Sequence, residues 1–255
     1  LVQPNAPQHQ KWDPEHIPRF FNRAIEYTAT GKRPDLIIWP ETSIPVPLNY
    51  AEQAISTISD AAHNVPVLAG VQRLDGLLLY NSAIVISAQG RVDQVYDKHH
   101  LVPFGEYLPF ASVASKLGLK GLAAEDGSGY AAGPGPRLLD LGVLGMALPL
   151  ICYEAVFPQD VAGAATRPDL LVQITNDAWF GQFSGPFQHL VQARMRAIEQ
   201  GLSMLRSANT GVSAVIDAKG RVLAQIGLGR AGYIDARVSQ AGPVTTYAMT
   251  GDLPL

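Results

Sequence analysis

The stretch GMALPLICYEAVFP, Gly145–Pro158, is an apolar run that stops at the chain's only cysteine. A short apolar segment bounded by glycine and by a polar pair is typical of a buried strand of an α/β sheet. Cys152 stands where this strand ends, and Tyr153 and Glu154 follow it. The sequence therefore predicts a single thiol at the carboxyl end of a strand, where open α/β sheets bind their ligands.

The rest of the chain alternates buried strands with amphipathic helices. This alternation predicts an α/β fold, and two hairpin-like pairs of strands predict that the sheets are mixed. Residues 1–18 read as a polar, extended start whose first ordered contacts begin at Trp12. We expect helices within 17–30, 49–64, 157–166 and 185–201, and strands within 34–41, 65–74, 79–87, 93–98, 144–152, 169–177, 203–217 and 220–226. In the helix 185–201 the apolar residues form one stripe, typical of a face packed on the core: Phe187, Leu190, Val191, Met195 and Ile198.

The composition excludes several classes of protein. Hydrophobic residues make up 47% and charged residues 16% of the 255 residues, as in a globular domain. The net charge of -3 gives no sign of the basic patch that nucleic-acid-binding proteins need, so we expect no nucleic-acid partner. No apolar run reaches the roughly 18 residues of a membrane span. The chain begins at Leu1 without a signal-peptide pattern, and we expect it to be a piece of a longer protein.

Three chemically active residues each follow a predicted strand. They are Glu41, Lys98 and Cys152, and the ends of such strands can converge although the residues are distant in sequence. A thiol with its ordinary pKa of about 8.5 needs help to become a nucleophile at neutral pH. A carboxylate can take its proton, and an ammonium group or the amide of Tyr153 can stabilise an oxyanion. The trio therefore predicts acyl transfer through a thioester.

Each of these residues also has a structural interpretation. A lone cysteine is often only a small buried apolar residue, Glu41 could cap a helix, and Lys98 could be a solvated strand end. For His189 we expect a structural hydrogen bond. His99 and His100 do not suggest a metal site, because adjacent residues of a strand point to opposite faces. We expect neither a metal nor a cofactor.

Three motifs that surround the trio resemble those of the nitrilase superfamily. They are WPET around Glu41, YDKHHLVPFGEY around Lys98 and ICYEAVFP around Cys152. The superfamily uses Glu, Lys and Cys in this chain order. The resemblance implies a four-layer αββα sandwich with two mixed sheets inside, and one nitrilase-like catalytic domain over residues 1–255.

Further motifs are similar to one branch of that superfamily, the apolipoprotein N-acyltransferases. They are NDAWFG at 176–181, RSANTG at 206–211 and YAMTGDLPL at the end of the chain. This resemblance implies that a phospholipid donates an acyl group to Cys152, and that the N-terminal amine of a diacylglyceryl-cysteine apolipoprotein then accepts it. Glu41 is implied as the general base and Lys98 as the electrostatic stabiliser. The family also implies transmembrane helices outside this chain and a catalytic domain that faces the periplasm from the bacterial inner membrane.

The same resemblance assigns supporting residues. Glu106 is implied as an additional active-site carboxylate, and Tyr153 and Glu154 as supports next to the nucleophile. A buried Glu154 needs a partner, for which Arg194, Arg196 and Lys98 are the candidates. We expect the pocket wall to contain Trp39, Asn176, Asp177 and Trp179.

The segment 103–136 is rich in Gly, Ala, Ser and Pro, and we interpret it as a lid whose middle contacts the membrane. Two other functions stay open. The first is a soluble nitrilase-type amidase, in which water replaces the acceptor amine. The second is a binding module of this fold without catalysis, against which the intact Glu41, Lys98 and Cys152 argue.

Overall fold

The computed structural model describes residues 1–107 and 129–253. Most of the segment 103–136, predicted to be a lid, lies outside the described residues. The strands of the described residues form two larger mixed sheets and one small antiparallel pair.

The smaller of the two mixed sheets has four strands in the order β2-β3-β4-β5. β2 runs parallel to β3, and the two remaining pairs are antiparallel. The strands correspond to four segments predicted from the apolar pattern, although the first is much shorter than expected. Their bounds are β2 (Ile37–Ile38), β3 (Val67–Asp75), β4 (Leu78–Ile86) and β5 (Val92–Asp97).

The other mixed sheet has six strands in the order β11-β10-β9-β8-β7-β6. β7, β8 and β9 are parallel neighbours. β6 and β10 run antiparallel to them, and the edge strand β11 is antiparallel to β10. The opening stretch of the sequence supplies β7, which lies inside this sheet. The bounds are β6 (Leu139–Asp140), β7 (Met146–Ile151), β8 (Leu170–Thr175), β9 (Met204–Ala208), β10 (Ser213–Ile216) and β11 (Val222–Ile226).

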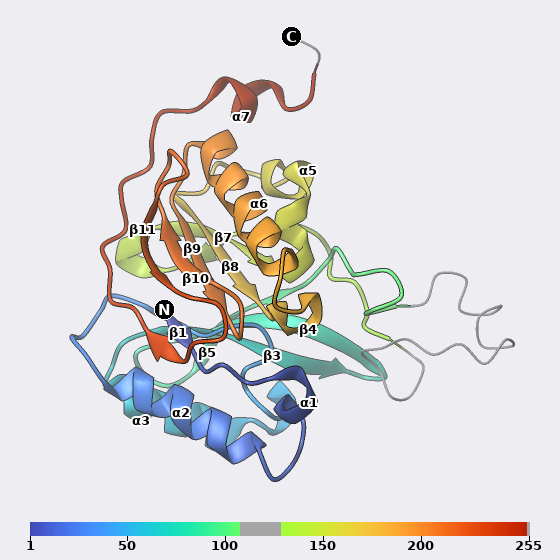
Figure 1. Cartoon of the computed structure of the whole chain (residues 1–255), viewed down its shortest axis with the longest axis vertical. Helices are drawn as coiled ribbons and strands as arrows, with labels where there is room; N and C mark the ends of the chain where they lie inside the picture. The colour runs from blue at the N-terminus through green and yellow to red at the C-terminus, as the bar shows by residue number, and fades with distance from the viewer. Residues whose placement is uncertain (108–128, 254–255) are drawn as a thin grey trace, which may run out of the picture.

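Helices cover the outer faces of both sheets and produce four layers (Figure 1). α2 (Ile17–Ala29) and α3 (Glu52–Ala62) lie on the four-stranded sheet, while α5 (Pro158–Ala162) and α6 (Gly185–Gln200) lie on the six-stranded sheet. Three apolar clusters fill the spaces between successive layers. The middle cluster joins the two sheets through Ile38, Leu68, Val85, Ile151, Val172 and Leu205. The predicted αββα sandwich is therefore confirmed.

The start of the chain is more ordered than predicted. β1 (Val2–Gln3) pairs antiparallel with β12 (Gly232–Tyr233), more than 200 residues away in sequence. The side chain of Gln3 is fully buried and donates hydrogen bonds to three backbone carbonyls. The prediction that ordered contacts begin at Trp12 is wrong, because this long-range pairing leaves no local pattern. Shorter elements are α1 (Gln8–Lys11), α7 (Thr246–Thr250), and the 3-10 turns η1 (Leu48–Tyr50) and η3 (Gly142–Leu144).

Helix α6 packs with a different face from the one predicted. Of its apolar stripe only Leu190 is buried; the others are about half exposed, Phe187 by 49% and Met195 by 47%. Small residues, Ala193 and Ala197, bring the helix close to the sheet, so that polar residues of the same face reach buried partners. The polar residues buried on this face are His189, Arg196 and Gln200.

The helices of residues 1–107 and 129–253 are all too short or too polar to cross a membrane.

Candidate active site

The candidate site lies where strands of both sheets end. Glu41 follows β2, Lys98 follows β5, and Cys152 follows β7. All three side chains are buried, and the charges of Glu41 and Lys98 both act on the pKa of the Cys152 thiol. The structure therefore brings together the three residues that the sequence proposed from separate strand ends.

The carboxylate of Glu41 is held by two neutral donors. The Asn81 side-chain amide donates to Oε1 at 2.6 Å, and the Asn176 backbone amide donates to Oε2 at 2.7 Å. Each oxygen has further lone pairs, so the carboxylate can still accept a proton. This environment orients Glu41 without a direct salt bridge and leaves its carboxylate able to act as a general base.

Lys98 forms an ion pair with Glu106. Its Nζ lies 2.9 Å from Glu106 Oε1 and 2.7 Å from Oε2, and the Val102 amide donates to Oε2 at 2.9 Å. Asn81 links the two carboxylates, because its Nδ2 also lies 3.1 Å from Glu106 Oε1. Burial alone would lower the pKa of Lys98, but Glu106, Cys152 and Glu41 outweigh it and raise that pKa. Lys98 is therefore a fixed cation in the site.

Cys152 begins a tight turn, η4 (Cys152–Val156), and its backbone φ is +50°. This left-handed conformation is uncommon for a residue other than glycine and is often retained at functional sites. Burial, followed by the negative charge of Glu41, raises the pKa of the thiol to about 12, and Lys98 opposes the rise. The thiol is thus protonated at neutral pH and needs a base before it can attack.

A buried polar network contacts the backbone carbonyl of Cys152. Gln173 donates to the Cys152 carbonyl at 3.1 Å, and His189 Nε2 lies 3.1 Å from the same oxygen. His189 Nδ1 lies 2.9 Å from Asp177 Oδ1, and Arg206 pairs with Asp177 Oδ2. The structural hydrogen bond predicted for His189 is present.

Asp177 serves this network and not the pocket wall where we predicted it. It is fully buried at the start of η5 (Asp177–Phe180). Burial alone would raise the pKa of Asp177, but Arg206 and then His189 outweigh it and lower that pKa to about 2. Asp177 is therefore an anion that neutralises the buried Arg206.

Glu154 has partners other than the predicted cations. Its carboxylate accepts hydrogen bonds from the Tyr96 hydroxyl at 2.8 Å and from the Ile151 amide at 2.7 Å, and it lies 2.7 Å from His99 Nδ1. The candidates proposed from sequence make other contacts, Arg194 to Gly220, Arg196 to Val156 and Glu199, and Lys98 to Glu106. The neighbouring Tyr153 packs edge-on against His100 and Phe157. Both residues thus shape the turn that carries the cysteine.

The other predicted wall residues lie in different surroundings. Asn176 is at the site, because its amide binds Glu41. Trp179 is 52% exposed in η5. Trp39 is fully buried in the outer core, where its Nε1 donates to Thr28 of α2 at 2.8 Å. Successive residues of an extended segment point to opposite faces, and Ile38 takes the inner one, so the structure does not bring Trp39 to the site.

Two residues of the site escaped the sequence reasoning. Asn81 lies inside β4 and bridges the carboxylates of Glu41 and Glu106. Lys11, the last residue of α1, is buried with its ammonium against the Glu41 turn. A single asparagine in a strand and a single lysine in a polar N-terminal segment carry no periodic signal, so only the folded arrangement identifies them.

Gly70 of β3 supports the turn that carries Glu41. A Cβ atom at this position would lie 2.4 Å from the Thr42 nitrogen and 2.6 Å from the Glu41 Cα, both backbone atoms that cannot rotate away. We expect Gly70→Ala to lower the free energy of unfolding by about 1–3 kcal/mol, as overpacking does, and to displace Glu41. Chemical denaturation measures the loss. Gly227→Ala is the control, since its nearest neighbour is 3.9 Å away; an equal loss in both variants would contradict the prediction.

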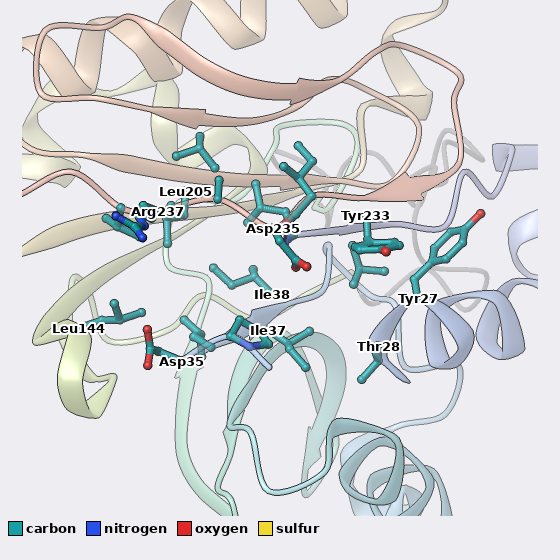
Figure 2. A pocket seen from close by; sticks show the side chains of 18 of the residues that line it. Tyr27, Thr28, Asp35, Ile37, Ile38, Leu144, Leu205, Tyr233, Asp235 and Arg237 are labelled. Atoms are coloured by element: carbon teal, nitrogen blue, oxygen red, sulfur yellow. Dashed lines mark hydrogen bonds between the residues drawn. The ribbon is translucent and has the colours of Figure 1, made fainter. Parts of the chain in front are cut away.

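A cavity of about 420 Å³ lies elsewhere in the molecule (Figure 2). Its labelled lining comes from α2, from β2 and the residues before it, from η3 and β9, and from β12 and the segment after it, with Tyr27, Ile37 and Asp235 among the residues that surround it. Glu41, Lys98 and Cys152 do not line it. We therefore do not assign this cavity to the candidate active site.

Comparison with known proteins identifies relatives that are named apolipoprotein N-acyltransferases. The chain is 44% identical over 270 residues to an apolipoprotein N-acyltransferase of Bradyrhizobium diazoefficiens, and 42% identical over 261 residues to one of Sinorhizobium fredii. The alignments cover 100% and 98% of this chain, but 50% and 49% of the relatives. The chain thus spans about half the length of the curated relatives it matches.

Solved structures share the fold at low identity. An amidase from Nesterenkonia sp. AN1 has a TM-score of 0.59 at 19% identity, and covers 89% of this chain and 86% of the amidase. A carbon-nitrogen hydrolase from Helicobacter pylori G27 has a TM-score of 0.62 at 17% identity, over 85% and 81% of the two chains. The family model described as Carbon-nitrogen hydrolase matches residues 1–244. By this match and by its αββα sandwich, the chain belongs to the carbon-nitrogen hydrolase family.

Proposed function

We propose that this chain is the catalytic part of an apolipoprotein N-acyltransferase with Glu41, Lys98 and Cys152 as its triad. The observation that carries the proposal is the convergence of a carboxylate, an ammonium group and a thiol at the ends of three strands. The names of the relatives supply the substrate class, an acyl group and an apolipoprotein. The acyl donor is a phospholipid, and the acceptor is the N-terminal amine of a diacylglyceryl-cysteine apolipoprotein.

The first half-reaction loads the cysteine. Glu41 takes the proton of the Cys152 thiol, and the sulfur attacks the carbonyl carbon of a phospholipid acyl ester. Lys98 and the Tyr153 amide stabilise the oxyanion of the tetrahedral intermediate. The ester C–O bond then breaks, Glu41 returns the proton to the leaving alcohol, and a lysophospholipid departs from the thioester.

The second half-reaction unloads the acyl group. The neutral α-amine of the apolipoprotein cysteine attacks the thioester carbonyl carbon, and the C–S bond breaks to form an amide. Glu41 receives a proton from the attacking nitrogen and passes it to the Cys152 sulfur, which regenerates the thiol. Over the cycle the proton of the attacking amine has replaced the one that left with the alcohol, and no atom changes its oxidation state.

The proposal includes a location. A phospholipid donor requires that the site reach a membrane, and we place the protein in the bacterial inner membrane with this part facing the periplasm. The relatives are about twice as long as this chain, which leaves room for transmembrane helices in the longer protein.

A soluble amidase is the second candidate. The Nesterenkonia protein of similar fold is an amidase with an active-site cysteine, and the same triad can pass an acyl group to water. The two candidates share the acyl-enzyme and differ in what discharges it.

Intact-protein mass spectrometry tests the proposal. After incubation with a phospholipid of defined acyl chains, we expect a mass increase of one acyl group, absent in Cys152→Ala. Addition of a diacylated lipopeptide should remove the adduct and yield the N-acylated peptide. Discharge at the same rate by water alone, or no adduct from phospholipid but one from a small amide, would favour the amidase.

A further inference from the structure

Lys11 carries a buried ammonium group, and the mechanism proposed for Glu41, Lys98 and Cys152 gives it no role. Its side chain reaches from α1 to the turn after β2, where Nζ donates to the Glu41 carbonyl oxygen at 3.1 Å and to the Thr42 hydroxyl. Only 8% of the residue is exposed. A lysine is almost never buried to this extent without a partner, and here the partners are the backbone and side chain next to the proposed base.

The turn that Lys11 contacts is strained. Thr42 has a backbone φ of +45°, an outlier for a β-branched residue. Hydrogen bonds from one ammonium group to the Glu41 carbonyl and to the Thr42 hydroxyl hold both residues of the turn. Neutral donors could make the same two hydrogen bonds, so the geometry of the turn does not by itself require a charge.

The charges of the site favour a second cation. The carboxylates of Glu41 and Glu106 lie in one hydrogen-bonded group through Asn81, and Lys98 is bound to Glu106. Two carboxylates and one ammonium leave an excess negative charge beside a thiol that must itself become an anion. The titratable groups whose charges act on Lys11 are Glu41 and Cys152, and the Trp12 ring lies 5.2 Å from its Nζ.

We infer that Lys11 is the second cation of the site, a positioning residue that holds the Glu41 turn and favours the thiolate of Cys152 by balancing the two carboxylates. This inference rests on the proposed role of Cys152 as nucleophile. Burial lowers the pKa of Lys11 to about 8, although Glu41 and Cys152 oppose the shift. The charge is therefore present at neutral pH and is lost in the alkaline range.

Alkylation of Cys152 by iodoacetamide tests the inference without phospholipid or lipopeptide. The chain has one cysteine, so the adduct mass reports this thiol alone. We expect Lys11→Met to be alkylated about tenfold more slowly than the wild type near pH 7, since one nearby opposite charge is worth about one pKa unit or more. The ratio of the wild-type alkylation rate to the Lys11→Met rate should approach one above about pH 9, where the wild type has lost the Lys11 proton.

Lys11→Arg gives a second, independent result. Arginine keeps its charge over the whole range, so this variant should match the wild type near pH 7 within about threefold and exceed it above about pH 9. Lys32→Met removes an exposed lysine and should follow the wild type at every pH. Near-UV circular dichroism checks that each variant is folded.

Three outcomes would overturn the inference: a Lys11→Met rate equal to the wild type at pH 7, a ratio that does not change with pH, or Lys11→Arg as slow as Lys11→Met. The last two would show that Lys11 acts through packing alone. If acyl transfer fails while the alkylation results hold, the proposed function is wrong and the inference about Lys11 stands. If acyl transfer succeeds and the alkylation results do not hold, the inference about Lys11 is wrong and the proposed acyltransferase function stands.

Discussion

Replacement of Glu41 by glutamine is expected to slow acylation of Cys152 by roughly 10²–10⁴-fold, the usual contribution of a general base. The physical reason is the thiol pKa of about 12, which leaves almost no thiolate at neutral pH in the resting site. Glutamine keeps the size of the side chain and can retain a hydrogen bond to the Asn176 amide, but it cannot accept the proton. Single-turnover acylation followed by mass spectrometry measures the effect.

Two controls accompany this measurement. Glu26→Gln alters an exposed carboxylate of α2 and should leave the rate unchanged. The Glu41→Gln rate should rise toward the wild-type rate in the strongly alkaline range, because hydroxide then replaces the missing base. An acylation rate of Glu41→Gln within about threefold of the wild type would mean that another group deprotonates the cysteine.

Replacement of Arg206 by methionine is expected to lower the free energy of unfolding by about 3–5 kcal/mol, the cost of leaving a buried charge without its partner. Arg206 and Asp177 are both fully buried and form an ion pair, and Arg206 also donates to Gln173, which holds the Cys152 carbonyl. Without the guanidinium, the side-chain partners left to Asp177 among residues 1–107 and 129–253 are His189 and Thr175. Chemical denaturation gives the free energy.

The control is Arg91→Met, which removes an exposed arginine of a turn and should change stability by less than about 0.5 kcal/mol. The double variant Arg206→Met with Asp177→Leu should lose less free energy of unfolding than the two single variants lose in sum. The reason is that Asp177→Leu removes the carboxylate that Arg206→Met leaves unpaired. A loss below about 1 kcal/mol for Arg206→Met alone would show that water or another cation replaces the arginine.

The elements around the candidate triad were predictable because their signals are local. An apolar run with a polar reactive residue soon after it identifies the ends of β2 and β7 without knowledge of the sheets, and the preceding turn identifies β5. The partners of Glu154 were not predictable in this way. Its side chain binds backbone amides and a tyrosine hydroxyl, and no charge pattern in the sequence marks such neutral donors.

Helix α6 shows why local patterns fail in other places. Its apolar stripe is a strong sequence signal, yet the helix packs on the sheet through Ala193 and Ala197. On the same face it buries His189, which contacts Asp177 and Arg206. Small residues allow a closer approach than Phe187 or Met195 would, and His189 on that face contacts Asp177 and the Cys152 carbonyl. Packing distance and polar satisfaction are properties of two surfaces, and one segment cannot encode them alone.

The sequence by itself determined an α/β fold with mixed sheets and the strand ends on which Glu41, Lys98 and Cys152 stand, since both depend on periodicity within a short window. The αββα sandwich was implied by the resemblance of the surrounding motifs to the nitrilase superfamily. Only the tertiary structure decided that Lys11 and Asn81 join the site, that Asp177 neutralises Arg206, and that Trp39 turns away from it. Those assignments depend on which buried charges and donors meet across distant segments. Buried charges and most buried polar groups need partners at the same time, and the chain can supply these partners from distant segments only when it is folded.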